Sequence, residues 1–170
     1  MSRLLRVSER ARADALAQLT RELGRLDAWS FWSVPGADHV VVAGTTGVFL
    51  VVPEIRDGFL SVEGRHVTVD GAQVRLRPIR AAARRLRNKL GTGAVGVAIE
   101  PVLCLIRATA GAPRTVQAVR IVPITGLAAD IARREKVLPP VRAQRVVRTL
   151  GMTVAGDQRR HAAVLRRRAG

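Results

Sequence analysis

Aromatic residues and cysteine are scarce in this chain. Their scarcity excludes a core built on aromatic packing, an internal disulfide and a structural zinc site. Phe, Trp and Tyr together make up 3% of the 170 residues, and Tyr is absent. The single cysteine, Cys104, cannot form a disulfide within the chain, and one Cys with three scattered His residues does not supply a four-ligand zinc site. We therefore expect the core to consist of aliphatic side chains, in line with a hydrophobic content of 48%.

Acidic residues are also few, and lysine is almost missing. The chain has 13 acidic residues against 29 basic ones, which gives a formal net charge of +16, and only Lys89 and Lys136 among the basic residues are lysines. Such an excess of positive charge indicates a polyanionic partner, such as nucleic acid or an anionic membrane face. A GC-rich genome would also favour arginine over lysine, so composition alone leaves both interpretations open.

No apolar run is long enough to cross a bilayer. The longest, Val40–Pro53, is interrupted by Gly44–Gly47 and is shorter than a membrane-spanning helix requires. Residues Met1–Arg6 lack the apolar centre of a secretory signal. We expect a soluble cytoplasmic protein without membrane insertion.

The periodicity of the apolar residues predicts alternating helical and extended segments. Apolar positions recur every three or four residues in four segments, which predicts helices over Ser8–Leu26, Pro78–Leu90, Thr125–Arg134 and Pro139–Leu150. Shorter β-branched or apolar runs predict strands over Trp29–Val34, His39–Ala43, Val48–Val52, Phe59–Val62, His66–Val69, Val102–Arg107 and Val116–Val122. The strands flanking Gly44–Gly47 are almost wholly apolar, so we expect them to be covered on both faces.

This order of elements predicts an α/β fold with a mixed central sheet flanked by helices. We assign residues 1–150 to a single domain and 151–170 to a basic C-terminal tail that is mobile or weakly helical. Gly91–Gly96 has the glycine spacing of a dinucleotide-binding loop. It follows a predicted helix and precedes a predicted strand, the reverse of the required order, so we reject that interpretation.

One stretch carries a family resemblance. It has Asp38-His39 before the first apolar strand, Gly47-Val48-Phe49 at the start of the second, and Gly58 further on. With these positions the segment resembles the nuclease-related domain (NERD) family. The resemblance implies a restriction-endonuclease-like core, and in an active member carboxylates that hold Mg²⁺ for phosphodiester cleavage.

The chain departs from the family pattern at the catalytic positions. The acid-x-Lys motif of the family falls on Val52, Pro53 and Glu54, so an apolar residue stands at the acidic position and a carboxylate at the lysine. A shifted reading, Glu54-Ile55-Arg56, keeps an acid-x-base pair but needs a bulge at Pro53. If the site is active, Asp38 and Glu54 bind Mg²⁺ and carry catalysis, helped by Asp14 or Glu22; otherwise no cofactor is expected.

Plainer interpretations stand beside the catalytic ones. Asp38 follows a Pro-Gly turn and suits a turn or strand start, and Glu54 suits an ordinary ion pair with a nearby arginine. Trp29, Phe31 and Trp32 suit packing rather than base stacking.

Arginines on two predicted helices are the candidate nucleic-acid contacts. One set lies on a helix without any acidic residue and the other on the last predicted helix: Arg80, Arg84, Arg87, Arg142 and Arg145. Our leading hypothesis is a catalytically degenerate nuclease fold that binds nucleic acid, in the first place DNA, through these surfaces. The alternatives are an active Mg²⁺-dependent nuclease using Asp38 and Glu54, and a protein-interaction or regulatory domain whose basic tail docks an acidic partner.

Overall fold

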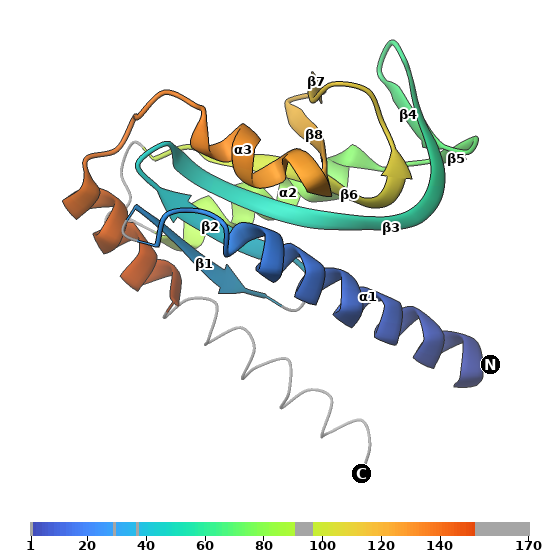
Figure 1. Cartoon of the computed structure of the whole chain (residues 1–170), viewed down its shortest axis with the longest axis horizontal. Coiled ribbons are helices and arrows are strands. Elements are labelled where there is room, and N and C mark those ends of the chain that lie inside the picture. The colour runs from blue at the N-terminus through green and yellow to red at the C-terminus, as the bar shows by residue number, and fades with distance from the viewer. Residues whose placement is uncertain (1, 29, 37, 91–96, 152–170) are drawn as a thin grey trace.

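A mixed β-sheet forms the centre of the protein (Figure 1). The computed structural model describes residues 2–28, 30–36, 38–90 and 97–151. Neighbouring strands of the sheet follow the order β1 (Phe31–Pro35), β2 (Val40–Gly44), β3 (Gly47–Glu63), β6 (Ile99–Thr109), β8 (Val119–Pro123) and β7 (Arg114–Val116). The far end of β3 also pairs with β4 (His66–Val69), which in turn pairs with β5 (Ala72–Gln73).

Strand direction changes across this sheet. β2 and β3 form an antiparallel hairpin, β3 runs parallel to β6, β6 runs parallel to β8, and β7 is antiparallel to β8. The predicted mixed α/β sheet flanked by helices is therefore confirmed.

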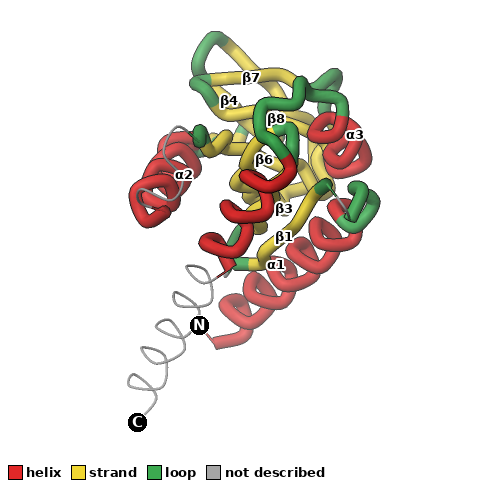
Figure 2. Tube along the Cα trace, turned by 90° about the vertical axis from the view of Figure 1, so that its left-hand side faces the viewer, coloured by secondary structure: helices red, strands yellow, loops and turns green. Residues whose placement is uncertain are grey.

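Helices cover both faces of the sheet (Figure 2). α1 (Ser2–Leu23) and α3 (Leu127–Ala132), which follows the 3₁₀ turn η2 (Ile124–Gly126), pack on one face, which we call the α1 face. α2 (Leu76–Leu90) and a helix over 140–151 pack on the other, the α2 face. The described helices include none that is long and apolar enough to cross a membrane.

Alternating side chains of the central hairpin divide the core into two layers. Val40, Val42 and Val51 belong to the cluster under α1, whereas Val41 and Leu50 belong to the cluster under α2. Every residue of β2 is buried. The expectation that these strands are covered on both faces is confirmed, since the period of two sends successive apolar residues into opposite layers.

Several predicted boundaries were wrong. Phe59–Val62 is not a separate strand, because β3 continues from Gly47 through Pro53 to Glu63. Val116–Val122 divides into β7 and β8 at a turn in which Gln117 and Ala118 adopt φ values of 48° and 59°. The first helix begins at Ser2 rather than Ser8, and the third ends at Ala132.

Some expectations fall on parts of the chain that the structure does not describe. The described ranges do not include Trp29, Gly91–Gly96 or the basic tail from residue 152 onward.

Candidate nucleic-acid interface

The exposed side of α2 is a continuous basic surface. Its buried stripe consists of Leu76, Ile79, Ala83, Leu86 and Leu90, spaced as an amphipathic helix requires. The remaining positions of the 15-residue helix include no acidic residue. Six of them are exposed and basic: Arg77, Arg80, Arg84, Arg85, Arg87 and Lys89.

Four of these arginines form one row along the helix. Arg77, Arg80, Arg84 and Arg87 are separated by three, four and three residues, so they lie above one another on the same side. Within the described part of the chain, no carboxylate pairs with any of the four guanidinium groups. This row, which we call the α2 arginine row, presents unneutralised charge over about 15 Å at 1.5 Å per residue.

The helix over 140–151 adds arginines to the same face of the sheet. Ala143, Val146 and Leu150 bury its inner side against the α2-face core, and the outward positions include exposed Arg142, Arg145 and Arg148. Its twelve residues include no acidic one. The structure thus places both predicted arginine sets, from segments far apart in sequence, on one face.

The α1 face differs in charge. α1 carries Glu9, Asp14 and Glu22 among its arginines, and Glu22 forms an ion pair with Arg25 at 2.9 Å. Acidic and basic residues therefore alternate over this helix, whereas both helices of the α2 face lack acidic residues. Among the described long helices, the excess of positive charge therefore lies on the α2 face of the sheet.

Asp38 lies in the loop before β2 and is exposed. Its Oδ1 is 2.6 Å from Nδ1 of His39. The hydrogen bond with His39 holds the pKa of the Asp38 carboxyl below its usual value, with a smaller contribution from Arg12 on α1. Asp38 is thus engaged by its neighbour His39, and its charge is also favoured by Arg12 of α1.

Glu54 lies on β3 and is held by Arg56. The Arg56 side chain reaches both carboxylate oxygens, with Nε donating to Oε1 at 2.9 Å and a terminal nitrogen donating to Oε2 at 2.7 Å, and its backbone N–H also donates to Oε1. Burial opposes ionisation of Glu54, yet these hydrogen bonds outweigh it and the pKa of Glu54 is lowered. Of the alternatives for Glu54, the ion pair with a nearby arginine is the one observed.

Asp38 and Glu54 lie in different parts of the structure. Asp38 lies in the loop between β1 and β2, where the N–H of Gly36 donates to the backbone oxygen of His39 at 2.7 Å. Glu54 lies within β3, where successive side chains point to opposite faces of the sheet. Ile55 packs in the α1-face core, which puts Glu54 toward the α2 face.

This arrangement does not fit a shared metal site. The described residues contain no group of three or more His, Cys, Asp or Glu side chains placed to hold a metal ion. Asp14 is exposed on α1, and Glu22 is engaged by Arg25. The register shift between β3 and β6 lies between Glu54 and Asp57 rather than at Pro53.

Phe31 and Trp32 pack against the core, as expected. Phe31 contacts the α1-face cluster and Trp32 the α2-face cluster. The Phe31 ring also occupies the space that a side chain at position 44 would need, so this position requires glycine. These aromatic residues are structural.

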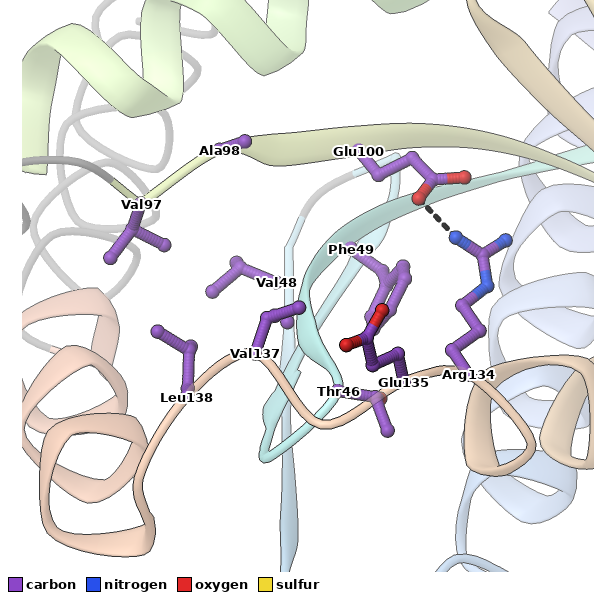
Figure 3. A pocket seen from close by; sticks show the side chains of 11 residues that line it. Thr46, Val48, Phe49, Val97, Ala98, Glu100, Arg134, Glu135, Val137 and Leu138 are labelled. Carbon is purple, nitrogen blue, oxygen red and sulfur yellow. Dashed lines mark hydrogen bonds and ion pairs between the residues drawn. The ribbon is translucent and has the colours of Figure 1, made fainter.

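Sequence reasoning missed a cavity of about 410 Å³ where β3 and β6 begin (Figure 3). Its walls are mostly apolar, with Val48, Val97 and Val137 among them, and Arg134 lies over the Phe49 ring at 5.0 Å. Arg134 pairs with Glu100 and with Asp130, so its charge is matched. This cavity does not offer the free positive charge that a phosphate requires.

Asp130 joins α3 to the sheet, and we expect its charge to stabilise the fold. It accepts from Arg120 at 2.6 Å and from Arg134 at 3.0 Å. Burial opposes its ionisation, but the two arginines lower its pKa below the ordinary 3.8. Because the folded pKa is lowered, this stabilisation is complete above about pH 4 and is lost as pH falls through the folded value.

Asp130→Asn should therefore lower the free energy of unfolding by about 1.5–3 kcal/mol at pH 7, a magnitude typical of hydrogen bonds to charged groups. The difference from the unsubstituted protein should shrink as pH falls below 4, measured by urea denaturation across a pH series. Asp57→Asn is the control, since Asp57 is 79% exposed and 3.8 Å from Arg107. A deficit in Asp130→Asn that is constant from pH 7 to pH 2.5 would contradict the assignment.

Comparison with models of known families, with curated proteins and with solved structures finds no match for this chain.

Proposed function

We propose that the protein binds nucleic acid, duplex DNA in the first place, through the helices of the α2 face. One observation carries the proposal: α2 and the helix over 140–151 bring exposed arginines to one face of the sheet without a single acidic residue in either helix. A solvent-exposed helix that binds no polyanion usually carries both acidic and basic residues, as α1 does. A row of unneutralised guanidinium groups suits the phosphates of a nucleic-acid backbone.

The proposal includes the loss of nuclease activity. The resemblance to the NERD family over residues 38–58 remains a prediction, and it supports a nucleic-acid partner. Glu54 is neutralised by Arg56, and Asp38 is hydrogen-bonded with His39 in the loop between β1 and β2, so each carboxylate is engaged by a neighbour of its own. Binding through phosphates with little preference for sequence is the function that this geometry supports.

Fluorescence anisotropy with a labelled 30-base-pair duplex tests the binding. Contacts to roughly five phosphates would make log affinity fall with log salt concentration with a slope of about −4.5. Duplexes of unrelated sequence should bind with similar affinity, because phosphates carry no base information. No detectable binding to duplex DNA or RNA at 50 mM salt would overturn the proposal and favour an acidic protein partner.

Incubation with supercoiled plasmid tests the loss of catalysis. We expect the plasmid to stay intact in Mg²⁺ or Mn²⁺ at protein concentrations that retard it in a low-salt gel. Asp38→Ala should leave that retardation unchanged. Metal-dependent cleavage that disappears in Asp38→Ala would show that the site works despite Val52 and Glu54.

A further inference from the structure

A second cavity, of about 410 Å³, opens at the start of α2. Its lining comes from the turn between β3 and β4, from the segment that leads from β5 into α2, and from the β7–β8 turn. The side chains that matter here are Arg65, His66, Arg75, Arg77 and Gln117.

The cavity is strongly cationic. Arg65, Arg75 and Arg77 are exposed, and within the described part of the chain none of their guanidinium groups has a carboxylate partner. No acidic residue lines the space. Glu63, which pairs with His66 across β3 and β4, is exposed and lies outside the lining. An anion entering this cavity would meet arginines from two separate segments.

The first turn of α2 adds to the positive electrostatic potential of this cavity. Leu76, Arg77 and Pro78 belong to both the lining and the first turn, which contains no acidic residue. Pro78 has no backbone N–H, but the N–H groups of Leu76 and Arg77 lack intrahelical acceptors, and the helix dipole places partial positive charge there. The helix start thus adds to the attraction that the three arginines create.

Hydrogen bonds fix the two sides of the cavity. Nε2 of Gln117 donates to the backbone oxygen of Arg65 at 2.6 Å, which ties the β7–β8 turn to the β3–β4 turn. Arg56 donates to the backbone oxygens of Ala72 and Gln73 at 3.2 and 3.3 Å. The cavity is therefore prearranged, and a bound anion would not have to order the backbone around it.

The cavity and the α2 arginine row share Arg77, so they form one surface. The row runs from Arg77 to Arg87 along the exposed side of α2, and the cavity lies at its Arg77 end. A nucleic-acid strand that follows the row would arrive at a concave site. An internal phosphate lies on the outside of a duplex between two sugars, whereas only a terminal phosphate projects freely enough to enter such a site.

We propose that this cavity binds the terminal phosphomonoester of a nucleic-acid strand, so that the protein prefers phosphorylated ends. The inference rests on the proposed nucleic-acid binding and adds the position on the strand. A phosphomonoester carries close to two negative charges near neutral pH and three acceptor oxygens, against one charge for an internal phosphate. It matches a cavity with three arginines better than an internal phosphate does.

Binding to hairpin DNAs with a single end provides the test. The same labelled hairpin is prepared with a 5′-phosphate, with a 3′-phosphate and with hydroxyl groups at both termini. We expect one phosphorylated form to bind roughly fivefold to tenfold more tightly than the hydroxyl form, as one added charge-assisted contact would give. Millimolar inorganic phosphate should weaken that form more than chloride of equal ionic strength does.

Two variants that each lose two positive charges test whether the preference for a phosphorylated end arises in this cavity. Arg65→Gln/Arg75→Gln should abolish the preference and leave the affinity for the hydroxyl hairpin within about threefold. Arg10→Gln/Arg21→Gln, on exposed positions of α1, should keep the preference. Thermal melting of each variant shows that it is folded.

The outcomes separate this inference from the function on which it rests. Equal affinity of the unsubstituted protein for all three hairpins overturns the terminal-phosphate site and leaves DNA binding standing. A preference that survives Arg65→Gln/Arg75→Gln overturns the assignment to this cavity. Absence of binding to every hairpin at 50 mM salt overturns the proposed function, and the inference with it.

Discussion

Gly58→Ala is expected to destabilise the protein by roughly 3 kcal/mol, adding the strain of a forbidden backbone conformation to the loss of one hydrogen bond. Gly58 has a φ of 119°, a region that side chains other than glycine rarely adopt. A Cβ at this position would lie 2.1 Å from the Asp70 carboxylate. Asp70 cannot simply move away, because its Oδ1 accepts from the backbone N–H of Phe59 at 2.8 Å.

Gly64→Ala is the matched control for this substitution. Gly64 also has a positive φ, of 59°, but no atom lies within 4 Å of the position of its Cβ. It should therefore lose only about 1 kcal/mol, the cost of the left-handed conformation. Urea denaturation of both variants gives the comparison, and equal losses would show that the contact with Asp70 contributes nothing.

Gly58 also shows that a motif can be recognised in a sequence while its structural cause stays hidden. Gly58 belongs to the motif that carries the family resemblance, and its spacing from Gly47 is visible in the chain. Its structural cause is Asp70, which lies twelve residues away in the turn after β4 and itself has a φ of 46°. No local pattern links the two residues, since the link depends on the pairing of β3 with β4.

Most helices and strands could be predicted because burial imposes a period on the sequence. The α2 stripe and the β2–β3 hairpin are examples, where the 3.6-residue and 2-residue periods leave little ambiguity. The β7–β8 turn was missed because Gln117 and Ala118 adopt positive φ values that a sequence normally signals with glycine or asparagine. The continuous strand β3 was missed because Pro53 ordinarily ends a strand. Pro53 is tolerated because β2 begins at Val40, opposite Val51, so Pro53 lies outside the pairing of β2 with β3.

The candidate catalytic pair was harder to judge, although the relevant information is partly local. Thr45 and Thr46 form a two-residue turn between the paired residues Gly44 and Gly47, and this turn fixes the register of the hairpin. Asp38 precedes the first paired residue, Val40, and lies in the loop between β1 and β2, so the register that places Glu54 does not extend to it. The acid-x-base spacing of Glu54 and Arg56 was visible in sequence, and it produces an ion pair.

The arginine surfaces could be predicted one helix at a time but not as one face. Periodicity identifies the exposed side of each helix, and the absence of acidic residues can be counted. That α2 and the helix over 140–151 share a face follows only from the topology, because β6, β7, β8 and α3 lie between them in the chain. The concentration of charge, which supports the proposed function, is a property of the folded protein.

Replacing three members of the α2 arginine row should remove most of the DNA affinity. Arg80→Gln/Arg84→Gln/Arg87→Gln deletes three phosphate contacts. The slope of log affinity against log salt concentration should therefore become less negative by about 2.7. At 0.1 M salt the affinity should fall on the order of several hundredfold, by the same counterion release. The fold should be unaffected, since all three side chains are exposed and have no carboxylate partner in the described part of the chain.

The control is a variant with the same net charge and a different distribution. Arg10→Gln/Arg12→Gln/Arg21→Gln removes three exposed arginines from α1, on the opposite face of the sheet. Both variants lower the formal net charge of +16 by three, so a long-range attraction governed by net charge would weaken both equally. Contact with phosphates at the α2 face instead predicts that only the α2 variant changes the salt slope. Equal slopes in the two variants would show that the arginine row is an ordinary solvated surface, and the proposal that DNA docks there would fail.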